Sequence, residues 1–432
     1  MTPEELRVAR WFRSKGRPIA AVDAHDRAPL EDGSALVVLE VRYADGGDSD
    51  RYLVPSRDGA EPRDGDGTWR AIVRAMATGA ELHGAHGVFR ASATPALGEL
   101  LPSPATAVEA LDERRLGVEQ SNTSVVLGDR LILKLYRLLE PGDNPDLEIG
   151  AFLTAAGFAD TPAVAGALTY EDPDHGTATA AMLQAFVPSS GDAWAAMLRA
   201  LATDPAQATR LAADLGDVTA RMHAALASAP DAPGFPARPA TTAETAAWRA
   251  AGERELAAAV GSVRSEDHDR LVALAPRVTA RFADAFGRAT GDEVVTRIHG
   301  DYHLGQVLAR ADGGLSVIDF EGEPARPLAE RREPSSPLRD VAGMLRSLDY
   351  AARTADRGPH APGFDADTWL AEARAAFLRP VGAVGGLVDA FELAKACYEV
   401  RYEANNRPDW LWLPMTAIER LVSGGGTTPR PR

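Results

Sequence analysis

The chain of 432 residues lacks several features that mark particular classes of protein. Cys397 is its only cysteine, which excludes an intrachain disulfide and any metal site built from several cysteines. No uninterrupted apolar run is long enough to cross a bilayer, and residues 1–16 show no signal-peptide pattern. We therefore expect a cytoplasmic protein with no membrane attachment.

Positive charge is also scarce. The chain has 46 Lys and Arg residues against 62 Asp and Glu residues, which gives a formal net charge of −16. Nucleic acids and anionic membranes are polyanions and would be repelled, so we expect neither as a partner, although a local basic pocket for a nucleotide remains compatible. The sequence is compatible with a monomer. The hydrophobic content of 45% is typical of a globular protein, and the length allows two or three domains.

The most informative stretch reads HGDYHLGQVL from His299, passes through a short turn and continues as SVIDFEGEP to Pro324. Asp301 and Asp319 flank this expected hairpin. A phosphoryl-transfer site needs one carboxylate beside the attacking hydroxyl and another that holds Mg²⁺ against the nucleotide phosphates. The layout therefore predicts a phosphotransferase that uses ATP and Mg²⁺.

The spacing supports this interpretation. In the protein-kinase catalytic loop, a metal-binding side chain follows the catalytic Asp by five residues, and a later Asp-Phe-Gly supplies the second metal ligand. Gln306 stands at that offset from Asp301, and Asp319-Phe320 stands where the second motif is expected. A single HGD tripeptide would be an ordinary polar turn, but the joint pattern favours the catalytic alternative.

Residues 1–100 have the pattern of a small separate module, an N-terminal cap. We expect a helix over Glu4–Ser14, strands over Ala35–Val41 and Tyr52–Val54, and a helix over Thr68–Thr78. No catalytic constellation occurs in this module.

Residues 101–188 have the pattern of a sheet lobe. A hairpin with a Gly128-Asp129 turn carries Lys134 in its second strand, where a lysine could contact phosphates or simply face solvent. The kinase glycine signature is absent, so the backbone and short polar side chains before the turn would cradle the phosphates. These candidates are Ser121, Asn122, Thr123 and Ser124.

A kinase-like lobe also needs a carboxylate partner for the strand lysine and a connection that binds adenine. Glu148, near the start of a helix expected from Asp146, is the candidate partner, although a carboxylate there also compensates the helix dipole. Gln184, Phe186 and Val187 end the last strand of the lobe and are expected to form the hinge.

Residues 189–432 are expected to be mainly helical. Helices are predicted over Leu211–Leu226, Trp248–Val260, Asp269–Phe286, 367–380 and 386–405, with another beginning at Leu338. His223 lies among apolar residues and is expected to be packed and hydrogen-bonded rather than catalytic. Asp340 is predicted to cap the helix from Leu338 and to orient the catalytic loop. The Gly/Pro/Thr-rich tail from Gly424 is expected to be frayed.

Several strings together resemble the maltokinase-like group, which includes maltokinases and glucosamine kinases and is related to the aminoglycoside phosphotransferases. They are HGDYHLGQVL, VIDFEGEPARPLAERREPSSPLRDVAGMLRSLDYA, VEQSNTSVVLGDRLILKLYR, PGDNPDLE and YEVRYEANNRPDW. The resemblance extends from about residue 100 to 420, and residues 1–100 match the extra cap of that group. It implies an α+β, two-lobed, protein-kinase-like fold with a small N-terminal cap.

The resemblance also implies roles for individual residues. Asp301 is expected to be the catalytic base, with His303 beside it at the substrate. Gln306 and Asp319 are expected to bind Mg²⁺, and Lys134 to bind phosphate while held by Glu148. Gln306 departs from the asparagine of protein kinases, which keeps a carbonyl oxygen but lengthens the side chain.

The acceptor is expected to be a sugar. The C-terminal segment supplies a candidate wall of carboxylates and an aromatic face, namely Glu399, Glu403, Asp409 and Trp410, although packing and surface charge explain such residues equally well. The N-terminal segment keeps only RWFRSKGR of the usual opening of the group, which favours glucosamine, phosphorylated to glucosamine 6-phosphate, over maltose. Maltose phosphorylation is the second hypothesis, and an aminoglycoside phosphotransferase and a non-catalytic binding module are further alternatives.

Overall fold

The computed structural model describes residues 1–117, 121–289, 291, 293–324, 326–382 and 385–423. The chain divides into two compact units. The first comprises Met1–Pro188 and Pro327–Ala329, and the second comprises Ser189–Arg326 and Glu330–Arg432. Residues 118–120, which precede the candidates Ser121 to Ser124, and the predicted frayed tail lie outside the described residues. No helix among the described residues combines the length and apolarity needed to cross a membrane.

The first unit contains two antiparallel sheets with short helices. The smaller sheet has the order β1-β2-β3, and the larger has the order β4-β5-β9-β10-β8-β7-β6. The elements are α1 (Pro3–Val8), β1 (Ile19–Pro29), β2 (Ala35–Tyr43), β3 (Asp50–Ser56), α2 (Thr68–Thr78), β4 (Glu81–His83), β5 (Val88–Ala93), α3 (Pro95–Leu100), α4 (Pro104–Ala107), η1 (Val108–Ala110), β6 (Glu113–Arg115), β7 (Asn122–Leu127), β8 (Leu131–Tyr136), α5 (Pro145–Ala155), β9 (Val164–Asp172) and β10 (Gly176–Ala185).

The small sheet is closed by the N-terminal segment. Thr2 and Glu5 form a reciprocal capping box that starts α1. The helix ends at Val8, short of the predicted Ser14, and the following Trp11 and Phe12 are buried against Tyr52. These aromatic side chains are therefore part of the core of the small sheet.

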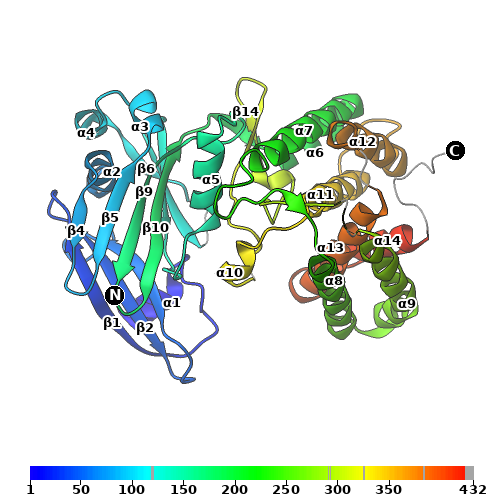
Figure 1. The fold of residues 1–432 in the computed structure, drawn as a ribbon, viewed down its shortest axis with the longest axis horizontal. Helices are drawn as coiled ribbons and strands as arrows, with labels where there is room; N and C mark the ends of the chain where they lie inside the picture. Colours follow the sequence, from blue (N-terminus) through cyan, green and yellow to red (C-terminus); the bar gives the residue numbers. More distant parts are fainter. Residues whose placement is uncertain (118–120, 290, 292, 325, 383–384, 424–432) are drawn as a thin grey trace. The chain divides into compact units, whose positions relative to one another are not determined.

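The two faces of the seven-stranded sheet pack in two separate hydrophobic clusters. Alternate residues of a strand point to opposite faces. Leu131, Leu133 and Leu135 of β8 pack in the core that contains α2, whereas Tyr136 packs in the separate cluster beside α5. Figure 1 shows α2 and α3 along one flank of this sheet, near β5 and β9.

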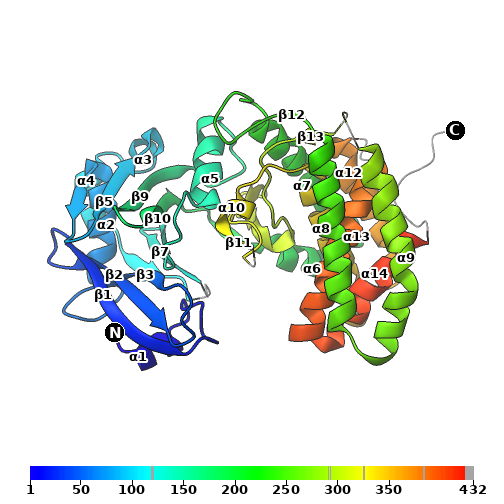
Figure 2. The same cartoon turned by 60° about the horizontal axis from the view of Figure 1, so that its bottom comes forward.

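The second unit is mostly helical. Its elements are β11 (Ser189–Asp192), α6 (Ala193–Thr203), α7 (Pro205–Leu226), β12 (Arg238–Pro239), α8 (Thr242–Ser262), α9 (Ser265–Arg288), β13 (Val294–Val295), η2 (Leu304–Gln306), β14 (Val307–Arg310), β15 (Leu315–Val317), α10 (Leu328–Arg331, partly in the first unit), α11 (Leu338–Arg357), α12 (Ala366–Val381), α13 (Gly385–Asn406), η3 (Pro408–Trp410) and α14 (Trp412–Val422). Figure 2 shows α8, α9, α13 and α14 packed side by side, while β11, β14 and β15 form a small antiparallel sheet.

Most predicted elements are present, with several differences. The predicted helix over Thr68–Thr78 has these bounds in the structure, and the β7–β8 hairpin turns at Gly128-Asp129. The long strand β1 was missed. Strands β4 and β5 were also missed; their residues were assigned to the cap, and they form one end of the seven-stranded sheet, in the order β4-β5-β9. The predicted capping role of Asp340 is wrong, because Pro337 is the N-cap of α11 and Asp340 lies inside its first turn.

Candidate functional site

The expected catalytic loop is held by the first turn of α11. The carboxylate of Asp340 is buried and accepts hydrogen bonds from the backbone N–H groups of His299, at 2.8 Å, and Gly300, at 2.9 Å. His223 contacts the same carboxylate through Nε2 at 3.1 Å, so the prediction that it is packed and hydrogen-bonded is confirmed. Burial alone would raise the pKa of Asp340, but its hydrogen bond and charge interaction with His223 outweigh burial and lower that pKa. The predicted orienting role of Asp340 is confirmed.

A glycine lets α11 approach this loop. An added Cβ on Gly343 would lie 2.6 Å from the carbonyl oxygen of Tyr302, which is closer than real Cβ contacts allow. The side chain of Tyr302 is buried on α7, where its hydroxyl group lies 3.0 Å from Thr219 Oγ1. The residue after Asp301 is thereby fixed from two sides.

The second strand of the hairpin brings Asp319 to Gln306. Gln306 Nε2 donates to Asp319 Oδ2 at 3.1 Å, and His299 Nε2 lies 3.0 Å from the carbonyl oxygen of Ile318. Asp319 has φ of 66°, in the left-handed region that a non-glycine residue adopts at a cost of about 1 kcal/mol or more. The fold therefore holds the predicted metal-binding pair together in a strained backbone position.

Lys395 of α13 bridges two carboxylates of this region. Its Nζ lies 2.9 Å from Glu323 Oε1 and 3.3 Å from Asp301 Oδ1. Burial alone would lower the pKa of Lys395, but the negative charges of Glu323 and Asp301 outweigh burial and raise it. Burial likewise would raise the pKa of Glu323, and the charges of Lys395, Arg339 and Arg326 instead lower it strongly. Both groups are thus charged at neutral pH.

Asp301 opens into a cavity of about 570 Å³ within the second unit. Gly300, Asp301 and Tyr302 of the catalytic loop form one part of its lining. The other lining residues include Trp248 of α8 and Tyr398 of α13, together with an excess of acidic over basic side chains. A hydroxyl compound with a cationic group could therefore bind beside Asp301 with favourable electrostatics.

The predicted phosphate-binding lysine lies in the first unit with a different partner from the one expected. Lys134 Nζ lies 2.8 Å from Asp146 Oδ2, and the hydroxyl group of Tyr136 donates to the same oxygen at 3.0 Å. Asp146 lies in the first turn of α5, which Asn144 caps. The sequence argument named Glu148, in the same turn, and missed Asp146; a role for Glu148 stays a prediction.

The strand register shows on which face of the sheet each residue predicted to bind phosphate lies. Ser124 is paired with Lys134 across β7 and β8, and cross-strand partners share a face of the sheet. Asn122 is paired with Tyr136, on that same face. Thr123 lies on the opposite face, where its Oγ1 accepts a hydrogen bond from Arg137 Nε at 2.8 Å. Ser121 directly precedes β7.

The predicted hinge lies at the end of the first unit. Gln184 is the second-last residue of β10, and the N–H group of Phe186 donates to the carbonyl oxygen of Arg130 at 2.8 Å. Val187 follows it, half-buried, and the boundary between the two units falls after Pro188. Adenine binding by these residues stays a prediction.

The two glutamates among the predicted acceptor residues of the C-terminal segment have arginine partners. Glu399 Oε2 lies 2.8 Å from Arg346 Nη2, and Glu403 is buried with Arg407 Nη2 at 2.6 Å. Asp409 and Trp410 belong to η3. None of these four is among the described residues that line the cavity beside Asp301.

His303 also has a local role. Its Nδ1 accepts a hydrogen bond from the N–H group of Gly305 at 3.0 Å and so caps the turn η2. Burial lowers the pKa of His303. A role for this residue at the substrate stays a prediction.

Sequence reasoning missed Lys395, Glu323 and Trp248. One signal could have pointed to Lys395, since the chain has only three lysines, at positions 15, 134 and 395, among 46 basic residues. Arginine is the default cation of this chain, so a lysine marks a position that requires a compact point charge. No comparable local signal singles out Trp248.

The side chains at the hairpin suit Mg²⁺. Mg²⁺ prefers oxygen ligands, commonly one or two carboxylates with waters and substrate phosphates. Gln306 offers an amide carbonyl oxygen, since its nitrogen already donates to Asp319, and Asp319 offers carboxylate oxygens. The chemistry of this donor pair therefore fits the ion that the sequence predicted.

Replacing Asp340 by Asn is expected to reduce kcat about ten- to a hundredfold with little change in the KM for ATP. One oxygen of an amide cannot accept from both His299 and Gly300, so one loop N–H loses its partner and Asp301 is misplaced by a fraction of an ångström. Steady-state kinetics would measure the change. Equal kcat for mutant and wild type would contradict the positioning role.

Comparison with known protein families gives two matches. Residues 112–378 match the phosphotransferase enzyme family, and residues 6–84 match the maltokinase N-terminal cap domain.

Individual proteins are similar over most of the chain. A glucosamine kinase of Streptacidiphilus jiangxiensis is 33% identical over 91% of this chain and 90% of its own length. A glucosamine kinase of Mycolicibacterium smegmatis is 29% identical over 90% of this chain and 100% of its own length. A solved glucosamine kinase in complex with glucosamine, ADP and inorganic phosphate has 30% identity and a TM-score of 0.74, covering 98% of this chain and 100% of the other.

Proposed function

The chain belongs to the phosphotransferase enzyme family, and from that premise we propose that it transfers the γ-phosphoryl group of ATP to glucosamine. The observation that carries the proposal is the acidic cavity beside Asp301, in a chain 33% identical to a glucosamine kinase. The expected product is glucosamine 6-phosphate. Its need for ATP favours the cytoplasm as the site of action.

The reaction centres on Asp301. One of its carboxylate oxygens accepts the proton of the primary hydroxyl group of the sugar as the hydroxyl oxygen attacks the γ-phosphorus of ATP. The bond from the γ-phosphorus to the β–γ bridging oxygen breaks, which releases ADP. Lys395 and Asp340 hold Asp301 and its loop in place. Catalysis comes mainly from positioning and charge neutralisation, without a covalent intermediate on the protein.

Lys134, held by Asp146, would bind the nucleotide phosphates, and Asn122 and Ser124 share its face of the sheet. The phosphates would also contact backbone groups of Ser121 and Thr123. Adenine would contact backbone groups of the predicted hinge, namely Gln184, Phe186 and Val187. Gln306 and Asp319 would hold Mg²⁺. When bound, the ion would supply positive charge that neutralises the phosphates.

The lining of the cavity supports an amino sugar as acceptor. It contains seven carboxylates and four cationic side chains, so the ammonium group of glucosamine would be attracted. Trp248 and Tyr398 offer aromatic surfaces to a sugar ring. Four further residues remain proposed for acceptor binding although they do not line the cavity, namely Glu399, Glu403, Asp409 and Trp410.

Maltose is the second candidate acceptor, because residues 6–84 match a maltokinase cap domain. A neutral disaccharide gains nothing from the acidic lining, which places it behind glucosamine. An aminoglycoside is a polycation that the same lining would also attract, so it must be tested directly.

Mg²⁺-dependent ADP release should be measured with glucosamine, glucose, maltose and kanamycin as acceptors. We expect the highest kcat/KM with glucosamine and a much lower value with glucose, because glucose lacks only the cationic group. A higher kcat/KM with maltose or kanamycin would show that this compound, and not glucosamine, is the acceptor. Absence of ADP release with every acceptor would favour a non-catalytic binding module.

A further inference from the structure

Three histidines and a buried aspartate of the first unit meet where the two sheets come together. His25 lies on β1 of the small sheet, His86 lies between β4 and β5, and Asp172 and His175 lie at the turn between β9 and β10. None of these residues takes part in the proposed phosphoryl transfer. We propose that His25, Asp172 and His175 bind a divalent transition-metal ion, Zn²⁺ being the ion of choice, at a structural site that joins the small sheet to the large one.

The geometry supports a three-ligand site. His25 Nε2 lies 2.7 Å from Asp172 Oδ2, and His175 Nδ1 lies 3.1 Å from Asp172 Oδ1. One potential ligand atom from each of the three residues lies within 4.8 Å of the others. Ligands around a tetrahedral Zn²⁺ lie roughly 3.3 Å apart, given bonds of about 2.0–2.2 Å. Small side-chain movements would therefore suffice, and water would fill the fourth position.

Asp172 is prepared to be a ligand. Its side chain is 2% exposed, and its Oδ1 accepts a hydrogen bond from the backbone N–H group of Asp174 at 2.9 Å, which helps to fix the orientation of the carboxylate. Two neutral imidazoles and one carboxylate form a donor set suited to Zn²⁺ and to neighbouring first-row metals.

Arg51 of β3 is the nearest opposing charge. Its Nη1 lies 3.2 Å from Asp172 Oδ2. Carboxylates that bind metals commonly accept a second hydrogen bond that fixes their orientation, and Arg51 is placed to supply it. Its positive charge weakens the attraction for a dication, so we expect occupancy to depend on both imidazoles.

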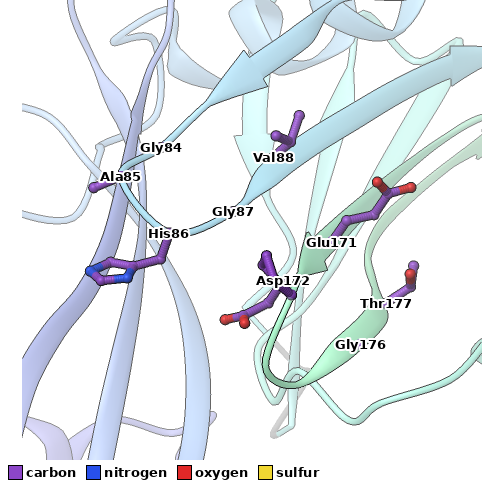
Figure 3. Close-up of a pocket in the computed structure, with 10 residues that line it drawn as sticks. Gly84, Ala85, His86, Gly87, Val88, Glu171, Asp172, Gly176 and Thr177 are labelled. Atoms are coloured by element: carbon purple, nitrogen blue, oxygen red, sulfur yellow. The ribbon is translucent and has the colours of Figure 1, made fainter.

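An entry route lies beside the cluster. A cavity of about 440 Å³ is lined by residues 84–88 on one side and by Asp172 and the β9–β10 turn on the other. Figure 3 shows the side chains of His86 and Asp172 on the flank of this cavity next to the earliest strands of the chain. The His86 ring stacks on the His25 ring, with centroids 5.0 Å apart, and so covers the proposed site from that side.

The consequence would be a cross-link between distant parts of the chain. His25 and Asp172 are 147 residues apart, and a metal that closes so long a loop restricts the unfolded chain strongly. The ion would fix the small sheet on the large one without taking part in the chemistry.

The test is metal binding by the full-length protein. After treatment with a chelator and with no nucleotide present, the protein should bind one Zn²⁺ per chain in isothermal titration calorimetry. Co²⁺ in its place should give the visible absorption of a tetrahedral site. His25→Ala and His175→Ala should each weaken binding by at least about a hundredfold.

His83→Ala is the matched control, because His83 is an exposed histidine of β4 outside the cluster, and its Zn²⁺ affinity should equal that of the wild type. An Asp319→Asn variant should keep the affinity as well, which separates this site from the proposed Mg²⁺ site. Absence of stoichiometric Zn²⁺ binding, or binding that survives loss of both His25 and His175, would show that the cluster is only a set of hydrogen bonds. Thermal unfolding of each variant without metal would establish that it is folded.

Discussion

Replacing Asp301 by Asn is expected to lower kcat about a thousandfold while leaving the affinity for the nucleotide within about twofold of wild type. The amide keeps the shape of the carboxylate but cannot accept the proton of the sugar hydroxyl group. Lys395 retains Glu323 as a partner at 2.9 Å, so the substitution leaves no buried cation without a counter-charge. The loss therefore falls on the chemical step.

The measurement combines steady-state ADP release with calorimetric titration of ADP. Asp312→Asn is the matched control, because Asp312 is an exposed aspartate in the turn of the same hairpin and contacts Arg310 rather than the cavity. It should leave kcat unchanged. An Asp301→Asn enzyme with wild-type turnover would remove Asp301 from the mechanism and leave another group to accept the proton.

The sequence predicted the parts of the site that lie close together in the chain. Asp301, Gln306 and Asp319 lie on one short hairpin, so their spacing largely determines their proximity, and the structure brings Gln306 and Asp319 within hydrogen-bonding distance. Lys134 was placed on the second strand of one hairpin by the local pattern, and its role was predicted from the kinase-like motif around Asp301 and from the family resemblance. Such local patterns need only the geometry of a turn and a strand.

The sequence did not predict contacts that depend on distant packing. Lys395 reaches Asp301 from 94 residues away, through the approach of α13 to the catalytic loop. Asp146 and Glu148 occupy the same first turn of α5, and the packing of that helix places the carboxylate of Asp146 2.8 Å from Lys134. Hydrophobic periodicity defines a helix but not its orientation on a sheet.

The edge of the large sheet illustrates the same limit. β5 pairs with β9 in antiparallel register, with Phe89 opposite Tyr170, although about eighty residues separate them in the chain. Both strands alternate as half-buried strands do, and this alternation does not specify which strand lies beside which. The predicted division between cap and sheet lobe at residue 100 followed composition and stays a prediction.

Replacing Asp319 is expected to weaken or abolish the contribution of Mg²⁺ to nucleotide binding, depending on the replacement, and to lower kcat by about a thousandfold or more. The choice of replacement matters, because the backbone at this residue has φ of 66°. Asn tolerates the left-handed conformation better than most residues, and Gly adopts it freely, so Asp319→Asn and Asp319→Gly should both fold. Alanine would confound the loss of a ligand with backbone strain.

The two variants differ in what they leave for the metal. Asn keeps one neutral oxygen and should retain weak Mg²⁺ dependence, whereas Gly leaves only the oxygen of Gln306 from the pair. Titration of ADP with Mg²⁺ and with a chelator would measure the difference directly. The affinity with chelator should equal that of wild type, while the gain on adding Mg²⁺ should fall in the order wild type, Asn, Gly. A full gain in ADP affinity on adding Mg²⁺ to the Gly variant would exclude Asp319 as the ligand. Asp301→Asn is the control, because it should keep the full gain and so separates metal binding from proton transfer.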